Sequence, residues 1–210
     1  MTIEQQPNEQ ESLLIIQQMI GRAKQENKDD GKGWILWGWL LFGASIFSFI
    51  NSELKITSQY FFWNSFGIIG SCFFLYQAIK YFLIKPRTRV KTYTGDLLRR
   101  LNIGFFISLF LLMIAMNFSI DPVAGFAILI NLYGFWLLIY GTALNFKPFT
   151  IGAFVNWILA MIALFVHSFD KIMLIHAAAV LCGYIIPGHL ANNEFRKAKR
   201  VVLINQDYSV

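Results

Sequence analysis

Charged residues are scarce in this chain. Only 14% of its 210 residues are Asp, Glu, Lys or Arg, whereas 56% are hydrophobic; a typical soluble domain is about one quarter charged. A soluble protein of this length has too little interior to bury so much apolar surface. The composition therefore argues against an ordinary soluble domain and predicts an all-α, polytopic integral membrane protein.

The charged residues leave six uncharged runs of 20 to 25 residues each. About 20 helical residues, at 1.5 Å per residue, cross a hydrocarbon core of roughly 30 Å. We predict a cytoplasmic leader (1–33), a transmembrane domain (34–188) and a basic cytoplasmic tail (189–210). The domain is predicted to be a bundle of six transmembrane helices over about 34–51, 60–80, 101–119, 122–145, 149–167 and 171–187.

No Asp, Glu, Lys or Arg lies inside any of the six runs. Proton relays, ion-coupled pumps and intramembrane aspartyl proteases need ionisable groups at depth, so these classes are disfavoured. We find no nucleophile–base pair and no metal-ligand spacing, and we predict a non-enzymatic protein without metal or cofactor. Cys72 and Cys182 lie near the middle of two runs without a redox motif, and we expect them to be small core residues.

Basic residues are concentrated between Lys80 and Arg100, which hold seven of the eighteen Lys and Arg. Successive spans place the loops on alternate sides of the membrane. Counted in this way, sixteen Lys and Arg fall on one side, and only Lys55 and Lys171 fall on the other. The positive-inside tendency then predicts that both termini are cytoplasmic. The net charge of +6 favours anionic lipid headgroups as a partner, and no nucleic-acid-binding module is present.

Two cytoplasmic segments have helical periodicity. The leader is predicted to form an amphipathic helix over about 9–28, and the tail a basic helix with one face formed by Ala191, Phe195, Ala198 and Val202. Each helix either lies on the lipid surface or binds a protein partner. The cations predicted to contact the membrane surface or a partner lie in the central basic segment and in the tail: Arg87, Arg89, Lys91, Arg99, Arg100, Arg196, Lys197, Lys199 and Arg200.

The polar residues inside the runs are few. Asn64, Asn131 and His176 are predicted to lie in the outer half of the bilayer, within about 10 Å of its midplane at 1.5 Å per residue, and we expect that they can meet in the bundle. They are interpreted either as hydrogen-bonding contacts between helices or as a small polar binding pocket. Asn156 is a further polar residue in the fifth run.

Small residues four apart predict close helix contacts, within the protomer or in a homo-oligomer. The pairs are Gly67 with Ser71 and Ala179 with Gly183.

Local signals mark several helix ends. Trp34, with Trp37 and Trp39, is expected at headgroup level near the start of the first span. Asp121–Pro122 predicts a capped helix start, and Lys147–Pro148 predicts another. Pro187 is expected to kink or end the sixth helix.

Three stretches carry a resemblance: residues 19–24 (MIGRAK), residues 36–40 (LWGWL) and residues 184–189 (YIIPGH). With them, most of the chain resembles an uncharacterised family of small six-span bacterial inner-membrane proteins. The resemblance implies a location in the bacterial inner membrane and six spans. It implies no reaction and no catalytic residue. We therefore expect an accessory subunit, sensor or anchor that acts by binding a partner at the cytoplasmic face. The alternative is a small-solute or lipid permease with a polar site in the outer half of the bundle.

Overall fold

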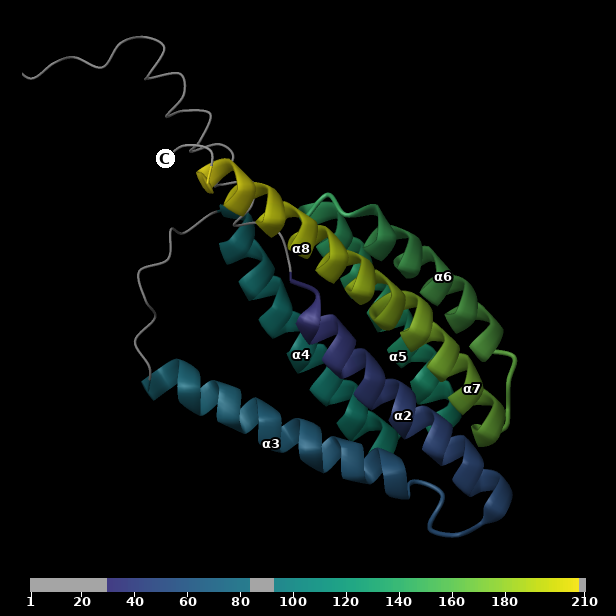
Figure 1. The fold of residues 1–210 in the computed structure, drawn as a ribbon. Coiled ribbons are helices and arrows are strands. Elements are labelled where there is room, and N and C mark those ends of the chain that lie inside the picture. Colours follow the sequence, from purple (N-terminus) through teal and green to yellow (C-terminus); the bar gives the residue numbers. More distant parts are fainter. Residues whose placement is uncertain (1–29, 84–92, 208–210) are drawn as a thin grey trace, which may run out of the picture.

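The computed structural model describes residues 30–83 and 93–207, and in these ranges every regular element is a helix (Figure 1). The prediction of an all-α protein is confirmed for this part of the chain. The leader helix predicted over 9–28 lies outside the described residues. The described elements are α2 (Lys32–Leu54), α3 (Phe61–Leu83), α4 (Tyr93–Phe118), α5 (Pro122–Ala143), α6 (Lys147–Ala163), α7 (Phe169–Val180), the π-helical segment η1 (Leu181–Ile185) and α8 (Ile186–Asp207).

Four helical stretches in the described ranges are long and apolar enough to cross a membrane: Lys32–Leu54, Gly95–Phe118, Pro122–Ala143 and Phe169–Arg200. The Lys147–Ala163 helix is apolar but shorter. The outside of the bundle is apolar too, since Phe110 and Ile107 on α4 are more than half exposed. Such a surface suits contact with lipid, because hydrocarbon carries no penalty for exposed apolar side chains. By length and composition, these helices are suited to a membrane protein.

Two helices begin where the loop residues predicted. The Asp121 carboxylate accepts hydrogen bonds from the backbone N–H groups of Val123 and Ala124 at 3.1 and 3.3 Å. Pro122 takes the first position of α5, where an N–H would have no partner within the helix. α6 likewise begins at Lys147, followed by proline. Both predicted starts are confirmed in position, but only α5 is capped by a side chain: the N-cap residue of α6 is Phe146, whose side chain forms no capping hydrogen bond.

We expected Pro187 either to kink or to end the sixth helix. The helix does not end there. It continues from Phe169 through Pro187 to Asp207. Just before the proline, the Leu181–Ile185 segment is π-helical, and the Ile186 N–H donates to the Leu181 carbonyl, five residues back. The wider turn accommodates the proline ring and its missing N–H, which a regular α-helix does not. The tail therefore extends directly from the bundle.

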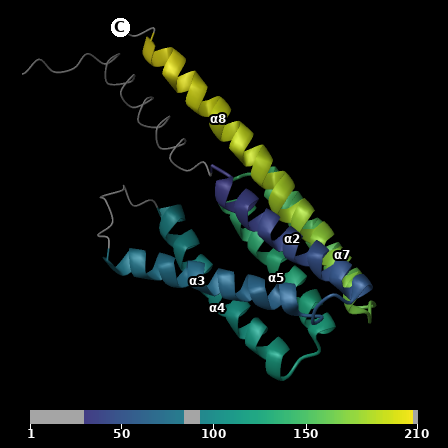
Figure 2. The same cartoon turned by 60° about the horizontal axis from the view of Figure 1, so that its bottom comes forward.

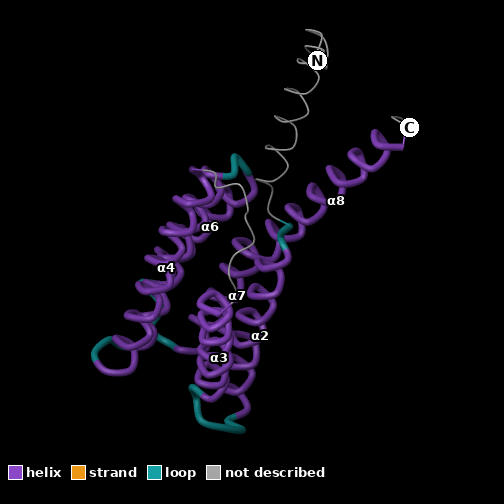
Figure 3. The backbone as a smooth tube through the Cα atoms, turned by 90° about the vertical axis from the view of Figure 1, so that its left-hand side faces the viewer, coloured by secondary structure: helices purple, strands orange, loops and turns teal. Residues whose placement is uncertain are grey.

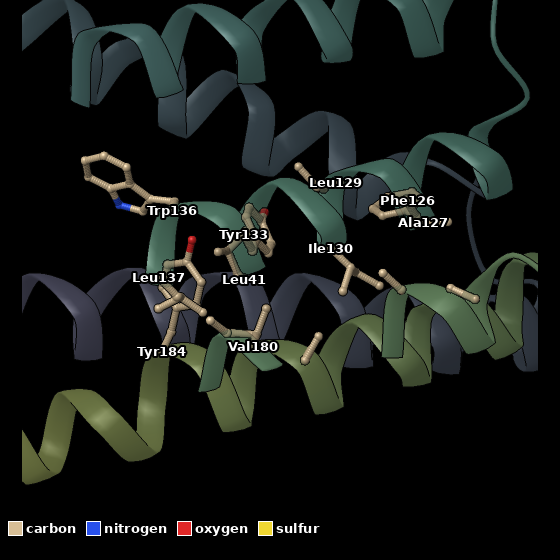
Figure 4. Packing of buried hydrophobic residues seen from close by; sticks show 14 of the residues in the cluster. Leu41, Phe126, Ala127, Leu129, Ile130, Tyr133, Trp136, Leu137, Val180 and Tyr184 are labelled. Carbon is tan, nitrogen blue, oxygen red and sulfur yellow. The ribbon is translucent and has the colours of Figure 1, made fainter. Parts of the chain in front are cut away.

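The core of the bundle lies between α5, α6 and the α7–η1 segment. Ile130, Leu137 and Val180 are completely buried there. Figure 4 shows these side chains, with Tyr184, between α5 and the α7–η1 segment. Trp34 also belongs to this core: it is 8% exposed, and its ring centroid lies 4.6 Å from that of Phe149. The expectation that Trp34 lies at headgroup level as an anchor is therefore wrong.

α3 is held to the bundle mainly by its first half. The centroids of the Trp63 and Phe126 rings are 4.7 Å apart, and those of Phe62 and Phe47 are 5.6 Å apart. Further along, Tyr76 is 61% exposed, and Figure 1 shows this part of α3 diverging from α2 and α4. Ile79, one turn further on, is also more than half exposed, so both of these apolar side chains lie on the outside of the described structure.

The two small-residue pairs behave differently. A Cβ on Gly183 would lie 2.6 Å from Asn156 Nδ2, so the Ala179–Gly183 face makes the close contact that the sequence predicts. A Cβ on Gly67 would only reach ordinary contact with Met113 at 3.5 Å, and Ser71 is exposed. Gly67 and Ser71 thus form no close contact within the described chain. Cys72 is exposed and Cys182 is partly buried, so the expectation of a core position is wrong for Cys72.

α8 projects beyond the other described helices (Figures 2 and 3). Ala191 is buried, and Phe195 and Ala198 are partly buried. The predicted division into two faces is confirmed as far as Arg200; the side chain of Val202 lies outside the described residues. The opposite surface exposes Arg196, Lys197, Lys199 and Arg200.

Candidate functional site

His176 of α7 is the centre of a buried polar cluster. Its side chain is completely buried, and its Nδ1 lies 2.8 Å from Ser45 Oγ of α2. The Ser45 hydroxyl donates its one proton to the Leu41 carbonyl, also at 2.8 Å, because a carbonyl can only accept. The imidazole Nδ1–H therefore donates to Ser45 Oγ. This arrangement leaves the lone pair of Nε2 facing the interior, and no described residue donates to it.

Aromatic rings surround the imidazole. Its centroid lies 5.1 Å from that of Trp63, 5.5 Å from that of Phe126 and 5.6 Å from that of Tyr133. The Trp63 indole N–H donates to Met173 Sδ at 2.8 Å, so the indole is also oriented by α7. Side chains from α2, α3, α5 and α7 thus converge on His176. Packing this dense supports a role in joining helices, since it fills the space around the ring.

Asn156 of α6 forms a second buried polar contact. Its Nδ2 donates to the Gly152 carbonyl at 2.8 Å and to the Ala179 carbonyl of α7 at 3.2 Å. Its Oδ1 has no hydrogen-bond partner among the described residues, and neither has Ser48 Oγ. Asn156 links α6 to α7 in the way expected of polar side chains inside membranes, where such bonds contribute on the order of 1 kcal/mol.

The structure does not group the three residues that the sequence analysis placed together. Asn64 and Asn131 are exposed, whereas His176 is completely buried. Asn131 contributes only its backbone carbonyl, which accepts from the Trp157 indole N–H at 3.3 Å. Ser45, which the sequence analysis did not single out, is the partner of His176.

A sequence signal for Ser45 exists. Trp34, Gly38, Leu41, Ser45 and Ser48 follow one another at intervals of three and four residues, and all are buried. This spacing marks one face of a helix, and a serine on such a face is directed toward a neighbouring helix.

The cations are divided between the two ends of the bundle. Lys55 and Lys171 lie at the end where α2 stops and α7 starts. The other end, which we call the basic end, is where α2, α4 and α6 begin and α8 leaves the bundle (Figure 1). Its described cations are Lys32, Arg99, Arg100, Lys147, Arg196, Lys197, Lys199 and Arg200. Arg87, Arg89 and Lys91 lie outside the described residues.

Cations on α4 and α8 differ in their partners. Asp96 accepts a hydrogen bond from Arg99 and forms an ion pair with Arg100 at 3.3 Å. No described carboxylate pairs with Arg196, Lys197, Lys199 or Arg200 of α8. The charge of α8 is therefore available to an anionic surface.

A groove of ≈ 440 Å³ opens between α2 and α8 at the basic end. Lys32, His189 and Arg196 contribute to its lining, together with the apolar side chains of Leu36 and Trp39. We refer to it as the α2–α8 groove. At the opposite end, a depression of ≈ 360 Å³ follows the turn from Phe165 to Lys171.

Within the described residues, no group of three or more His, Cys, Asp or Glu side chains is positioned to hold a metal ion. Comparison with protein-family models, curated proteins and solved structures yields no match to this chain. The surfaces of this chain are therefore the basis for any assignment of function.

Proposed function

We propose that this protein is a six-span protein of the bacterial inner membrane that acts by binding, as an accessory subunit, sensor or anchor for a protein partner at the cytoplasmic face. The observation that carries the proposal is α8, which leaves the bundle as a continuous helix with four exposed cations that pair with no described carboxylate. A helix that extends beyond the apolar region and exposes charge is suited to contact an acidic protein surface.

The helix order supports six crossings. α3 and α6 each lie between two helices that are long enough to span the membrane. If either of them did not cross, the described clusters of cations before and after it would lie on opposite sides of the membrane. The positive-inside tendency then assigns the basic end to the cytoplasm. The leader predicted over 9–28 would lie on the same side, because it directly precedes α2.

The permease alternative has less support. It relied on a polar site made by Asn64, Asn131 and His176, but two of these side chains are exposed and the third is packed among aromatic rings. A transport path needs polar groups that line a common cavity.

Cysteine labelling tests the six-span orientation. In a protein with Cys72→Ser and Cys182→Ala, we expect Lys55→Cys and His167→Cys to react with a membrane-impermeant maleimide in spheroplasts. Lys199→Cys is expected to react only after the membrane is permeabilised, because it lies at the opposite end of the bundle. Labelling of Lys199→Cys in intact spheroplasts would contradict the orientation.

Photo-crosslinking tests the docking role of α8. A photoreactive amino acid at Lys199 is expected to give one defined protein adduct in cells, and the same group at Ile158, which is 59% exposed on α6, is expected to give none of that adduct. Lys197→Glu with Arg200→Glu should reduce the adduct about tenfold or more by charge repulsion. Lys55→Glu with Lys171→Glu, at the other end, is the matched control. An adduct that persists after charge reversal on α8, or the absence of any protein adduct, would reject docking through these cations.

A further inference from the structure

The two helices that line the α2–α8 groove are in contact beside it. Gly31 has a φ of 69°, and a Cβ there would lie 2.2 Å from the Gly188 carbonyl oxygen, so the two backbones are in direct contact. Asn192 Nδ2 donates to the Asp30 carbonyl at 2.6 Å, which ties α8 to the residue that precedes α2. The two walls of the groove are therefore joined at this end, through the Gly31 and Gly188 backbones and the Asn192 side chain.

Polar and apolar groups are separated along the length of the groove. Lys32 and Arg196 lie at the end that faces away from the bundle, and Leu36 and Trp39 follow on α2 toward the apolar region. The eight residues from Lys32 to Trp39 cover about 10 Å of helix, at about 1.5 Å per step. The polar headgroup layer of one leaflet is on the order of 5 to 8 Å thick. The groove lining therefore changes from charged to apolar over about the same distance as a lipid changes from headgroup to acyl chain.

His189 adds a directed polar atom. Its Nδ1 lies 2.8 Å from the Ile185 carbonyl, and because that oxygen can only accept, Nδ1 carries a proton and donates. This bond fixes the ring on α8 and leaves Nε2 as the atom that can meet a ligand. The side chain itself is exposed in the groove.

The charge of the groove selects an anion. Its lining contains the two permanent cations Lys32 and Arg196, and no described carboxylate is part of it. The carboxylate of Asp30, two residues before Lys32, accepts a hydrogen bond from the Lys32 backbone N–H at 3.1 Å. Trp39 is 53% exposed and provides a broad apolar face beside these charges.

We propose that the α2–α8 groove binds one anionic phospholipid of the cytoplasmic leaflet. The phosphodiester lies between Lys32 and Arg196, within reach of His189 Nε2, and the first acyl carbons lie against Leu36 and Trp39. Basic pockets between transmembrane helices on the cytoplasmic side suit such headgroups, because Lys and Arg neutralise the phosphate and the aromatic ring covers the glycerol and upper chain. This inference rests on the membrane orientation in the proposed function, and it needs no protein partner.

Lipid retention by the purified full-length protein tests the site. After delipidation in mild detergent, native mass spectrometry is expected to show one tightly retained phosphatidylglycerol and no equivalent retention of phosphatidylcholine. Lys32→Gln and Arg196→Gln should each weaken phosphatidylglycerol binding about fivefold, the factor that corresponds to one basic residue at an anionic surface. Lys55→Gln and Lys171→Gln, at the opposite end, should bind as the unmodified protein does.

Three outcomes would overturn the inference. One is equal retention of the two lipids, and another is unchanged binding in the Lys32→Gln, Arg196→Gln double variant. A third is full competition by inorganic phosphate or glycerol phosphate, which would identify a free phosphate as the ligand. Trp39→Ala should weaken lipid binding and leave the binding of free phosphate unaffected.

Equal thermal unfolding midpoints without lipid confirm that the variants fold. Loss of the α8 crosslink with lipid binding intact would reject only the docking proposal. Exterior labelling at position 199 would reject the orientation and, with it, the assignment of the lipid to the cytoplasmic leaflet.

Discussion

Replacement of Gly183 by Leu is expected to destabilise the bundle by about 4 kcal/mol or more, at the upper end of what single substitutions cost. A Cβ at this position would already lie 2.6 Å from Asn156 Nδ2 and 2.7 Å from Leu137 Cδ1. The opposing backbone cannot yield easily, because a Cβ on Gly152 would lie 3.2 Å from Gly183 Cα. The four carbons of Leu would therefore force α6 and η1 apart and break the Asn156 contact to the Ala179 carbonyl at the end of α7.

Gly104 provides the matched control for this prediction. It is also a helical glycine in a predicted span, but a Cβ there meets nothing within 4 Å. Gly104→Leu should unfold at or slightly above the midpoint of the unmodified protein, since Leu has the better helix propensity. Equilibrium unfolding in mixed SDS and mild-detergent micelles measures both variants. Equal midpoints for Gly183→Leu and Gly104→Leu would refute the close contact between α6 and η1.

His176→Ala is expected to cost about 3 to 5 kcal/mol, as truncation of a buried aromatic ring does. The substitution removes the ring that Trp63, Phe126 and Tyr133 contact and leaves a cavity where α2, α3, α5 and α7 meet. His167→Ala, on the exposed turn before α7, is the control and should change the unfolding free energy by about 0.5 kcal/mol or less.

A double-mutant cycle with Ser45 separates hydrogen bonding from packing. Ser45→Ala alone leaves the buried Nδ1–H of His176 without an acceptor and should cost about 1 to 3 kcal/mol. In the His176→Phe background the same change should cost less by about 1 kcal/mol, because no donor remains. Additive costs in the cycle would show that the 2.8 Å contact between Ser45 and His176 contributes no coupling.

Helix limits were predictable because they depend on local chemistry. Asp121 caps α5 and Pro122 follows it, and these two adjacent residues are enough to specify the start of the helix. Pro187 shows where such reasoning stops. Its usual effect is to end a helix, but the π-helical turn at Leu181–Ile185 lets the path continue, and a π-helical turn depends on the contacts of the whole segment.

The orientation of each helix about its own axis decided which polar residues are buried in the candidate site. Asn131 and His176 are both polar residues near the middle of apolar runs, yet one is exposed and the other is buried. Composition alone does not distinguish them, because the burial of each side chain depends on which face of its helix points into the bundle. The same holds for Trp34 and Trp39, of which the first packs in the core and the second lines the α2–α8 groove.

The sequence by itself determined the class of this protein, the positions of its apolar segments and the separation of its cations by loop. These are properties of the chain taken in order, since hydrocarbon excludes charge and requires each segment to satisfy its own backbone hydrogen bonds. Only the tertiary structure decided that Ser45 meets His176 across 131 positions of sequence and that Lys32 and Arg196 share one groove. Such pairs arise from the close approach of helices at glycines such as Gly31 and Gly188, which no single segment specifies.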